Sequence, residues 1–304
     1  LEWSFAMKDL RYALRLAGRN PGFAAIVIAT LALGIGAATA MFSVVNGVLL
    51  KPLPYHEADR LVWMFGAFRQ NDSAAVSPLD FRDYRDRNEV FETLGAMAGG
   101  LPAVTVAGPD GPERFASASI TSGVITALGV PPALGRDFTR DEERTTGPQS
   151  VVLGHRFWQD RFAGDPGALG QSLTIDGRPH TIVGVMPEGF RLPTMASASG
   201  PDLFLPLPFD TDTARVRAYH YLRLVGRLEP GVTVEAAQSH MDVIARQLEV
   251  AYPESNETWK LRLVSLRERV IGDVRGTLLI MMSAVLLVLV VACANVAGLL
   301  LARA

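Results

Sequence analysis

Two stretches without charge decide the fold of this chain: FAAIVIATLALGIGAATAMFSVVNGVLL at 23–50 and GTLLIMMSAVLLVLVVACANVAGLLLA at 276–302. Neither contains a Lys, Arg, Asp or Glu. A helix of about 20 apolar residues crosses a hydrocarbon core about 30 Å thick. One charge at the centre of such a helix opposes insertion by about 2.5–3.5 kcal/mol. The sequence therefore predicts two transmembrane helices, over 21–50 and 273–302.

The segment between these helices, 51–272, has the composition of a soluble domain and is long enough to bury its own core. Short apolar runs alternate in it with turn residues, and two longer helices are expected, at 78–88 after Ser77 and at 234–252 after Thr233. Asp176-Gly177 between two such runs predicts a β-hairpin. The fold class is therefore an α+β extracytoplasmic domain flanked by two transmembrane helices.

Three local expectations concern charge and element ends. The many charges of 78–88 are interpreted as a solvated helix face, and Asp141-Glu142-Glu143 as a solvated helix start. The pattern also predicts a helix near 121–128 and a strand over 261–266 that leads back to the membrane.

The N-terminal residues 1–20 precede the first apolar stretch and are expected to form an amphipathic helix. Its apolar residues recur at helical spacing and its basic residues fall on another face, which suits a helix lying in the membrane interface. An ordinary soluble helix packing on a partner is the alternative. A signal peptide is excluded because the apolar run far exceeds an h-region. The basic residues before the first span favour cytoplasmic chain ends and an external loop.

No catalytic, cofactor-binding or metal-ligating residues are assigned. No two histidines lie at i, i+4, no Cys or HExxH pattern accompanies them, and no P-loop or nucleophile elbow is present. Gly34-Ile35-Gly36 resembles part of a dinucleotide-binding fingerprint, but the third glycine and the preceding strand are missing. The small residues of this stretch are therefore expected to pack against another helix; they are Ala25, Ala29, Gly34, Ala38 and Ala40. Asn46 and Asn295 are expected to bond neighbouring helices. The net charge of −2 gives no indication of a nucleic-acid partner.

Several longer motifs resemble one known family. They are NPGF (20–23), LALGIGAATAMFSVVNGVLLKPLPY (31–55), LGVPPALGRDF (128–138), TIVGVMPEGF (181–190), GRLEPGVTVEAAQ (226–238) and ACANVAGLLLARA (292–304). Together with the order of helix, span, domain and span, they resemble the MacB/FtsX-type ABC transporter permeases, in the large, often duplicated branch that is abundant in acidobacteria.

The resemblance implies a multi-pass protein of the bacterial inner membrane with its large loop in the periplasm or at the cell exterior. It implies a periplasmic core domain in two parts, 51–95 with 205–272 near the membrane and 96–204 inserted, and further spans beyond 303–304. The implied partners are an ABC ATPase, which binds the ATP, a second permease copy, a periplasmic protein and membrane lipid. Such a subunit is no enzyme and has no cofactor of its own.

Three functions remain open at this point. The chain is expected to be a permease subunit that couples ATP hydrolysis by its partner to export or to motion in the periplasm. The alternative is a membrane-anchored extracytoplasmic sensor or binding protein, and a membrane-bound enzyme is the third. Transmission of motion requires stiff connections at 51–54 and 272–276.

Overall fold

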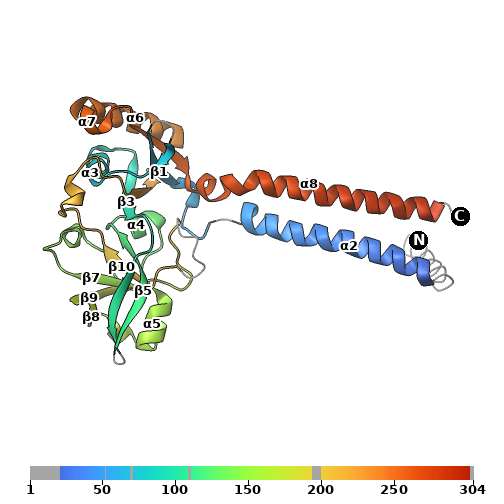
Figure 1. Cartoon of the computed structure of the whole chain (residues 1–304), viewed down its shortest axis with the longest axis horizontal. Helices are drawn as coiled ribbons and strands as arrows, with labels where there is room; N and C mark the ends of the chain where they lie inside the picture. Colours follow the sequence, from blue (N-terminus) through green and yellow to red (C-terminus); the bar gives the residue numbers. More distant parts are fainter. Residues whose placement is uncertain (1–20, 52, 69–70, 109–110, 194–199, 302–304) are drawn as a thin grey trace. The chain divides into compact units, whose positions relative to one another are not determined.

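The computed structural model describes residues 21–51, 53–68, 71–108, 111–193 and 200–301 (Figure 1). The expected amphipathic helix at 1–20 and the chain end at 303–304 lie outside this part. Two compact units are present, one formed by the chain ends up to Pro52 and from Ile271, and one over Leu53–Val270. Each is considered by itself.

The first unit consists of two long apolar helices. They are α2 (Pro21–Val45), continued by a π-helical turn (Asn46–Leu50), and α8 (Leu266–Leu301), which starts in the second unit. Both are long and apolar enough to cross a membrane, over Ala24–Leu50 and Val274–Gly298, and most of their surface is exposed. Such all-round apolar exposure suits a lipid environment.

The two helices are in contact at Gly34. A Cβ at this glycine would lie 3.0 Å from Leu289 Cδ1 and 3.9 Å from Ala292 Cβ. Of the other small residues expected at a helix contact, Ala25, Ala29 and Ala40 are exposed. Asn46 and Asn295 are exposed as well, so their expected bonds to neighbouring helices stay a prediction.

The second unit is built on one sheet whose strands run in the order β10-β7-β9-β8-β4-β5-β3-β11-β1-β12. Their bounds are β1 Leu61–Phe68, β2 Asn71–Ala74, β3 Phe91–Ala98, β4 Ala103–Gly108, β5 Gly111–Ile120, β6 Leu134–Gly135, β7 Ser150–Leu153, β8 Ser172–Ile175, β9 Arg178–Val185, β10 Leu203–Pro206, β11 Leu222–Leu228 and β12 Lys260–Ser265. Because β10 also pairs with β5, the strands from β10 to β5 close into a barrel. The open remainder, β3-β11-β1-β12, continues from β5.

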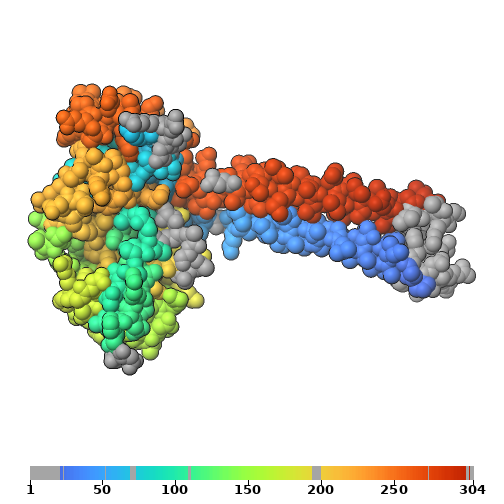
Figure 2. All heavy atoms as spheres, viewed as in Figure 1, coloured from blue at the N-terminus to red at the C-terminus, as the bar shows by residue number. Residues whose placement is uncertain are grey.

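Helices cover both parts of this sheet. They are α3 (Pro78–Arg87), α4 (Val124–Leu128), α5 (His155–Phe162), α6 (Val234–Ala251) and α7 (Pro253–Asn256). Phe157 of α5 belongs to the core cluster of the barrel strands. On the open sheet, α6 buries Ala237, Met241, Ile244 and Leu248, and with α7 it forms the orange surface at one end of the domain (Figure 2).

Three hydrophobic clusters make up the core. One draws only on residues 62–98 and 207–263, another only on 104–203, and the cluster around Trp63 and Phe204 draws on both ranges. The α+β class is confirmed. The division of the domain at 95 and 205 stays a prediction, because the strands form one sheet and the shared cluster crosses those positions.

Several local expectations are confirmed. Ser77 and Thr233 cap α3 and α6 through their side chains. Asp176 and Gly177 both have positive φ, 48° and 77°, as a tight hairpin turn of this kind requires.

Other local expectations were wrong. The charges of α3 are not all solvated, because Asp80 is fully buried, where Ser77, Asn256 and Arg217 donate hydrogen bonds to it. Glu142 and Glu143 are buried rather than solvated, with 4% and 3% of their surface exposed. Two further expectations are confirmed with shifted ends: the helix expected near 121–128 is α4, which begins at Val124, and the strand expected over 261–266 is β12, which ends at Ser265 because Leu266 starts α8.

Candidate functional site: the entry joint

The two connections to the apolar helices leave the domain from neighbouring strands. β1 and β12 are antiparallel, and Val62 near the start of β1 pairs with Ser265 at the end of β12. The segment that enters β1 and the helix that follows β12 are therefore adjacent at one end of the sheet. This end is the place where a displacement of either helix would reach the domain.

The exit through β12 has no intervening loop. The first residue of α8, Leu266, is fully buried in the cluster around Trp63, and Ser265 Oγ accepts a hydrogen bond of 3.1 Å from the Glu268 N–H. A capped helix start that is anchored in a core is rigid, so the domain holds the first turn of α8 firmly.

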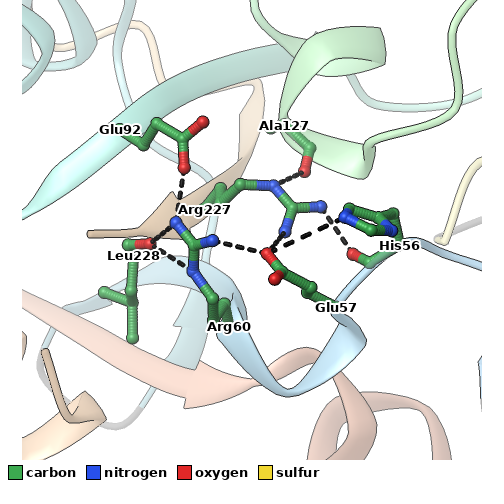
Figure 3. A network of polar contacts seen from close by, with 7 residues as sticks. All are labelled: His56, Glu57, Arg60, Glu92, Ala127, Arg227 and Leu228. Atoms are coloured by element: carbon green, nitrogen blue, oxygen red, sulfur yellow. Dashed lines mark hydrogen bonds and ion pairs between the residues drawn. The ribbon is translucent and has the colours of Figure 1, made fainter. Parts of the chain in front are cut away.

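The entry segment is held by a network of charged groups, which we call the entry joint: His56, Glu57, Arg60, Glu92 and Arg227 (Figure 3). Arg60 ends a short 3-10 turn and donates from Nε and Nη2 to the Leu228 carbonyl of β11, at 3.0 and 2.7 Å. The same guanidinium pairs with the carboxylates of Glu57 and Glu92. Glu57 stands in a left-handed conformation, φ 44°, which turns the chain toward Arg60.

Arg227 is the buried centre of the entry joint, with 4% of its surface exposed. It lies on β11 and donates from Nε to the Ala127 carbonyl of α4 at 3.0 Å and from Nη2 to the His56 carbonyl at 2.6 Å. Its Nη1 lies 3.4 Å from Glu57 Oε2. Burial, together with the nearby cation of Arg60, lowers the pKa of Arg227. The charge is retained because a guanidinium stays protonated at any pH a protein meets.

Close packing leaves the entry joint little freedom. A Cβ on Gly129, which follows α4 with φ 66°, would lie 2.6 Å from Arg227 Nη2 and 2.8 Å from His56 Cβ. Tyr55, just before the joint, donates from its hydroxyl to the Arg191 carbonyl at 3.1 Å, and burial raises its pKa to about 12. The entry segment is therefore bonded to β11, to α4 and to the loop after β9.

The entry joint offers positioning rather than reaction chemistry. Its donors all point at backbone carbonyls or at carboxylates, which are acceptors that hold a conformation. Within the described residues, no three His, Cys, Asp or Glu side chains lie close enough to hold a metal ion.

Sequence reasoning assigned no residue to a site and so missed the entry joint. Arg227 carried a usable signal, because it stands between Gly226 and Leu228 in the strand LRLVGRL of β11, whose one other charge is Arg223. A charge in a strand buried on both faces needs a partner. The identity of that partner could not be read, since Glu57 and the two carbonyls come from distant segments.

Comparison with known proteins places this fold in a family. The model of the MacB-like periplasmic core domain matches residues 24–244. No curated protein sequence matches the chain. Among solved structures, a domain of a putative permease from Porphyromonas gingivalis aligns with a TM-score of 0.50 at 16% identity, over 70% of this chain and 92% of that one.

Two further solved structures align at lower scores. The periplasmic region of MacB from Actinobacillus actinomycetemcomitans gives a TM-score of 0.49 at 13% identity, over 72% of this chain and 92% of that one. The extracellular domain of the noncanonic ABC-type transporter YknZ from Gram-positive bacteria gives 0.47 at 15% identity, over 66% and 99%. Because the family model covers more than two thirds of its length, this chain belongs to the family of MacB-like ABC transporter permeases that carry the MacB-like periplasmic core domain.

Proposed function

We propose that this chain is the permease subunit of an ABC-type export or mechanotransmission system, without catalytic chemistry of its own. A partner ATPase on the cytoplasmic side hydrolyses ATP, and the two apolar helices carry the resulting motion to a domain in the periplasm or at the cell exterior. The subunit acts with a second permease copy in the bacterial inner membrane, surrounded by lipid, and an extracytoplasmic protein is a further partner.

The observation that supports this proposal most is the way the domain holds both connections. The entry segment is fixed by Arg60 and Arg227, and α8 continues from β12 as one unbroken helix through Gly272 and Gly276. A signal carried as displacement needs such stiff connections, because a flexible linker would absorb it. A tethered binding protein would gain nothing from them.

The test uses the full permease in its native membrane together with whatever ATPase it recruits. A Gly-Gly-Ser insertion after Gly272 should leave assembly and ATP hydrolysis intact while abolishing transport or extracytoplasmic motion. The matched control is the same insertion after Gly177, in an exposed hairpin turn. Unchanged coupling with the insertion at Gly272 would contradict transmission through α8.

Arg227→Met tests the entry joint in the same assay. Methionine keeps much of the stem's volume but leaves the Ala127 and His56 carbonyls without their donor, so coupling should fall while ATPase binding persists. Arg178→Met, at an exposed position on β9, should leave coupling unchanged.

The alternative, a membrane-anchored sensor or binding protein, predicts a different outcome in a mild-detergent pull-down of the full-length protein. A stoichiometric ABC ATPase among the co-purifying proteins supports the permease. Its absence while the permease dimer stays intact would favour the sensor.

A further inference from the structure

Three side chains on α3 or beside it have a buried polar atom without a hydrogen-bond partner in the described chain: Tyr84 Oη, Trp259 Nε1 and Nε2 of the partly buried His220. Tyr84 is fully buried and Trp259 is 5% exposed. A buried polar atom left unpaired destabilises a fold by about 1–3 kcal/mol. Three such atoms in one place therefore require an explanation.

The three side chains lie together because Trp259 contacts both of the others. Its ring stacks on the His220 ring, with centroids 4.2 Å apart and planes 23° apart. Burial raises the pKa of the Tyr84 hydroxyl, and the Trp259 indole acts in the opposite direction, as a nearby hydrogen-bond donor does, although the two atoms do not meet in full hydrogen-bonding geometry. On its other side the indole lies against Gly66, where a Cβ would come within 2.0 Å of the ring.

The hydrogen-bonding roles of the three atoms are complementary. The Trp259 indole can only donate, and a tyrosine hydroxyl both donates and accepts. His220 Nδ1 lies 2.9 Å from the Ala218 carbonyl. A carbonyl only accepts, so Nδ1 carries the proton, and Nε2 of the neutral ring is left as an acceptor. One donor, one acceptor and one group that is both are the partners that a single water molecule satisfies.

The surroundings favour a neutral ligand over an ion. The nearest buried charge, Asp80, is already compensated by Arg217, which pairs with it, and by the Asn256 amide at 3.0 Å. Burial lowers the pKa of His220 against the opposing effect of Asp80, so the ring stays neutral near pH 7.

We propose that Tyr84, His220 and Trp259 form a binding site for one buried water molecule. The water accepts from the Trp259 indole N–H, donates to His220 Nε2 and exchanges a hydrogen bond with Tyr84 Oη. It joins α3, the segment before β11 and the turn before β12 into one network, and such waters typically make about three hydrogen bonds in proteins. The site is independent of the proposed transport function.

The sign of a stability change tests the site first. Tyr84→Phe, in the full chain in detergent, removes a hydroxyl that the proposal pairs with water, so the midpoint of thermal unfolding should fall by several degrees. If Tyr84 Oη has no partner, the same change removes an unpaired polar atom and the midpoint should rise. An unchanged or raised midpoint overturns the proposal. Tyr219→Phe, at a 56% exposed ring, is the matched control and should leave the midpoint unchanged.

A spectroscopic measurement on the unaltered chain tests the water itself, whether or not the variant folds. With tryptophan labelled by ¹⁵N, the indole proton of Trp259 should show a nuclear Overhauser effect to a long-lived water, and Trp259→Phe identifies its signal. Trp158, whose indole N–H donates to the Asp165 carbonyl at 2.9 Å, is the control and should show none. Absence of the effect at Trp259 overturns the proposal.

Discussion

At the scale of single residues, two buried carboxylates fix the 3-10 turn Arg140–Glu143, one through neighbouring residues and one through a remote helix. Glu142 accepts from the Arg136 guanidinium at 2.9 and 3.0 Å, from Ser150 and from the Thr139 backbone, within one capping box. Glu143 accepts from Arg85 of α3 at 2.9 Å and so joins the barrel side of the domain to that helix.

These residues mark the limit of prediction from the sequence. The run Asp141-Glu142-Glu143 has the composition of a solvated helix start, and the capping box that Thr139 forms with Glu142 was not predicted from it. Nothing local reveals Arg85 or Ser150, because the partners that make burial of the two glutamates possible are brought in by the sheet.

Glu142 gives the domain a pH-dependent stability. Burial alone would raise its pKa, but the hydrogen bonds from Arg136, Ser150 and the Thr139 N–H hold it at about 2, against an ordinary 4.5. The carboxylate therefore stabilises the fold fully above pH 4.5, and this stabilisation should be lost as the pH falls from 4.5 toward 2. The unfolding midpoint of the full chain, followed by circular dichroism across this range, measures it. Glu142→Gln should flatten the dependence, whereas Glu188→Gln, at an exposed carboxylate, should not.

At the scale of elements, strong local signals were sufficient to predict helices and turns, whereas contacts between distant segments could not be predicted from the sequence. The capped helices α3 and α6 and the Asp176-Gly177 hairpin follow from turn and cap chemistry. Strand β3 was not expected, because FETLGAMA places a glycine, Gly95, at its centre. Glycine normally weakens a strand. Here it is needed because the start of α4 lies directly on β3.

Gly95 gives a test of that close approach. A Cβ there would come within 2.5 Å of the Val124 backbone nitrogen, so Gly95→Ala should destabilise the domain by about 1–3 kcal/mol, the range for overpacking. Gly99→Ala is the matched control, since its nearest atom would be the Tyr221 carbonyl oxygen at an ordinary 3.6 Å. Urea denaturation of both variants measures the difference. Equal unfolding midpoints for the two variants would show that α4 moves away from β3 without loss of stability.

The outer edge of β12 is covered by a side chain of α6. Gln238 accepts from the Leu263 N–H at 2.8 Å and donates to the Leu261 carbonyl at 2.7 Å, as a neighbouring strand would. An uncovered strand edge invites pairing with another chain. Gln238 therefore prevents the strand of another chain from pairing with β12.

Removing this cover should have two effects. Gln238→Ala should lower the free energy of unfolding by about 1–3 kcal/mol, because two backbone groups lose their partner, and should speed hydrogen exchange of the Leu263 amide. Gln247→Ala, on the exposed face of the same helix, should do neither. Unaltered exchange at Leu263 in the Gln238 variant would mean that another group takes over the contact.

At the scale of the whole domain, one sheet and one shared cluster run through both sets of elements. The cluster around Trp63 contains residues of β1, β3, β5, β7, β10 and α4. Such a core favours a single cooperative transition over separate unfolding of the barrel and the open sheet.

We expect the barrel and the open sheet to unfold in the same transition. Trp158 lies on the barrel side and Trp259 beside the open sheet. With 5-fluorotryptophan in the full chain, the native ¹⁹F signals of these two residues should disappear at the same urea concentration. Two separated midpoints would show that the barrel is an independent folding unit.

Two ladders of the sheet are short, β4 with β8 and β3 with β5, and the second of them joins the barrel to the open sheet. In the described residues its register contains one pair, Met97 with Ile120, although β11 and β3 are paired along nearly their whole length. Torsional stiffness of a ribbon grows with the width of its attachment. Strand pairing alone thus resists a twist between the barrel and the open sheet only weakly, and the shared cluster around Trp63 and the Arg85–Glu143 ion pair supply the remaining resistance. A twist between two states of the domain would therefore strain these side-chain contacts before any strand changes its register.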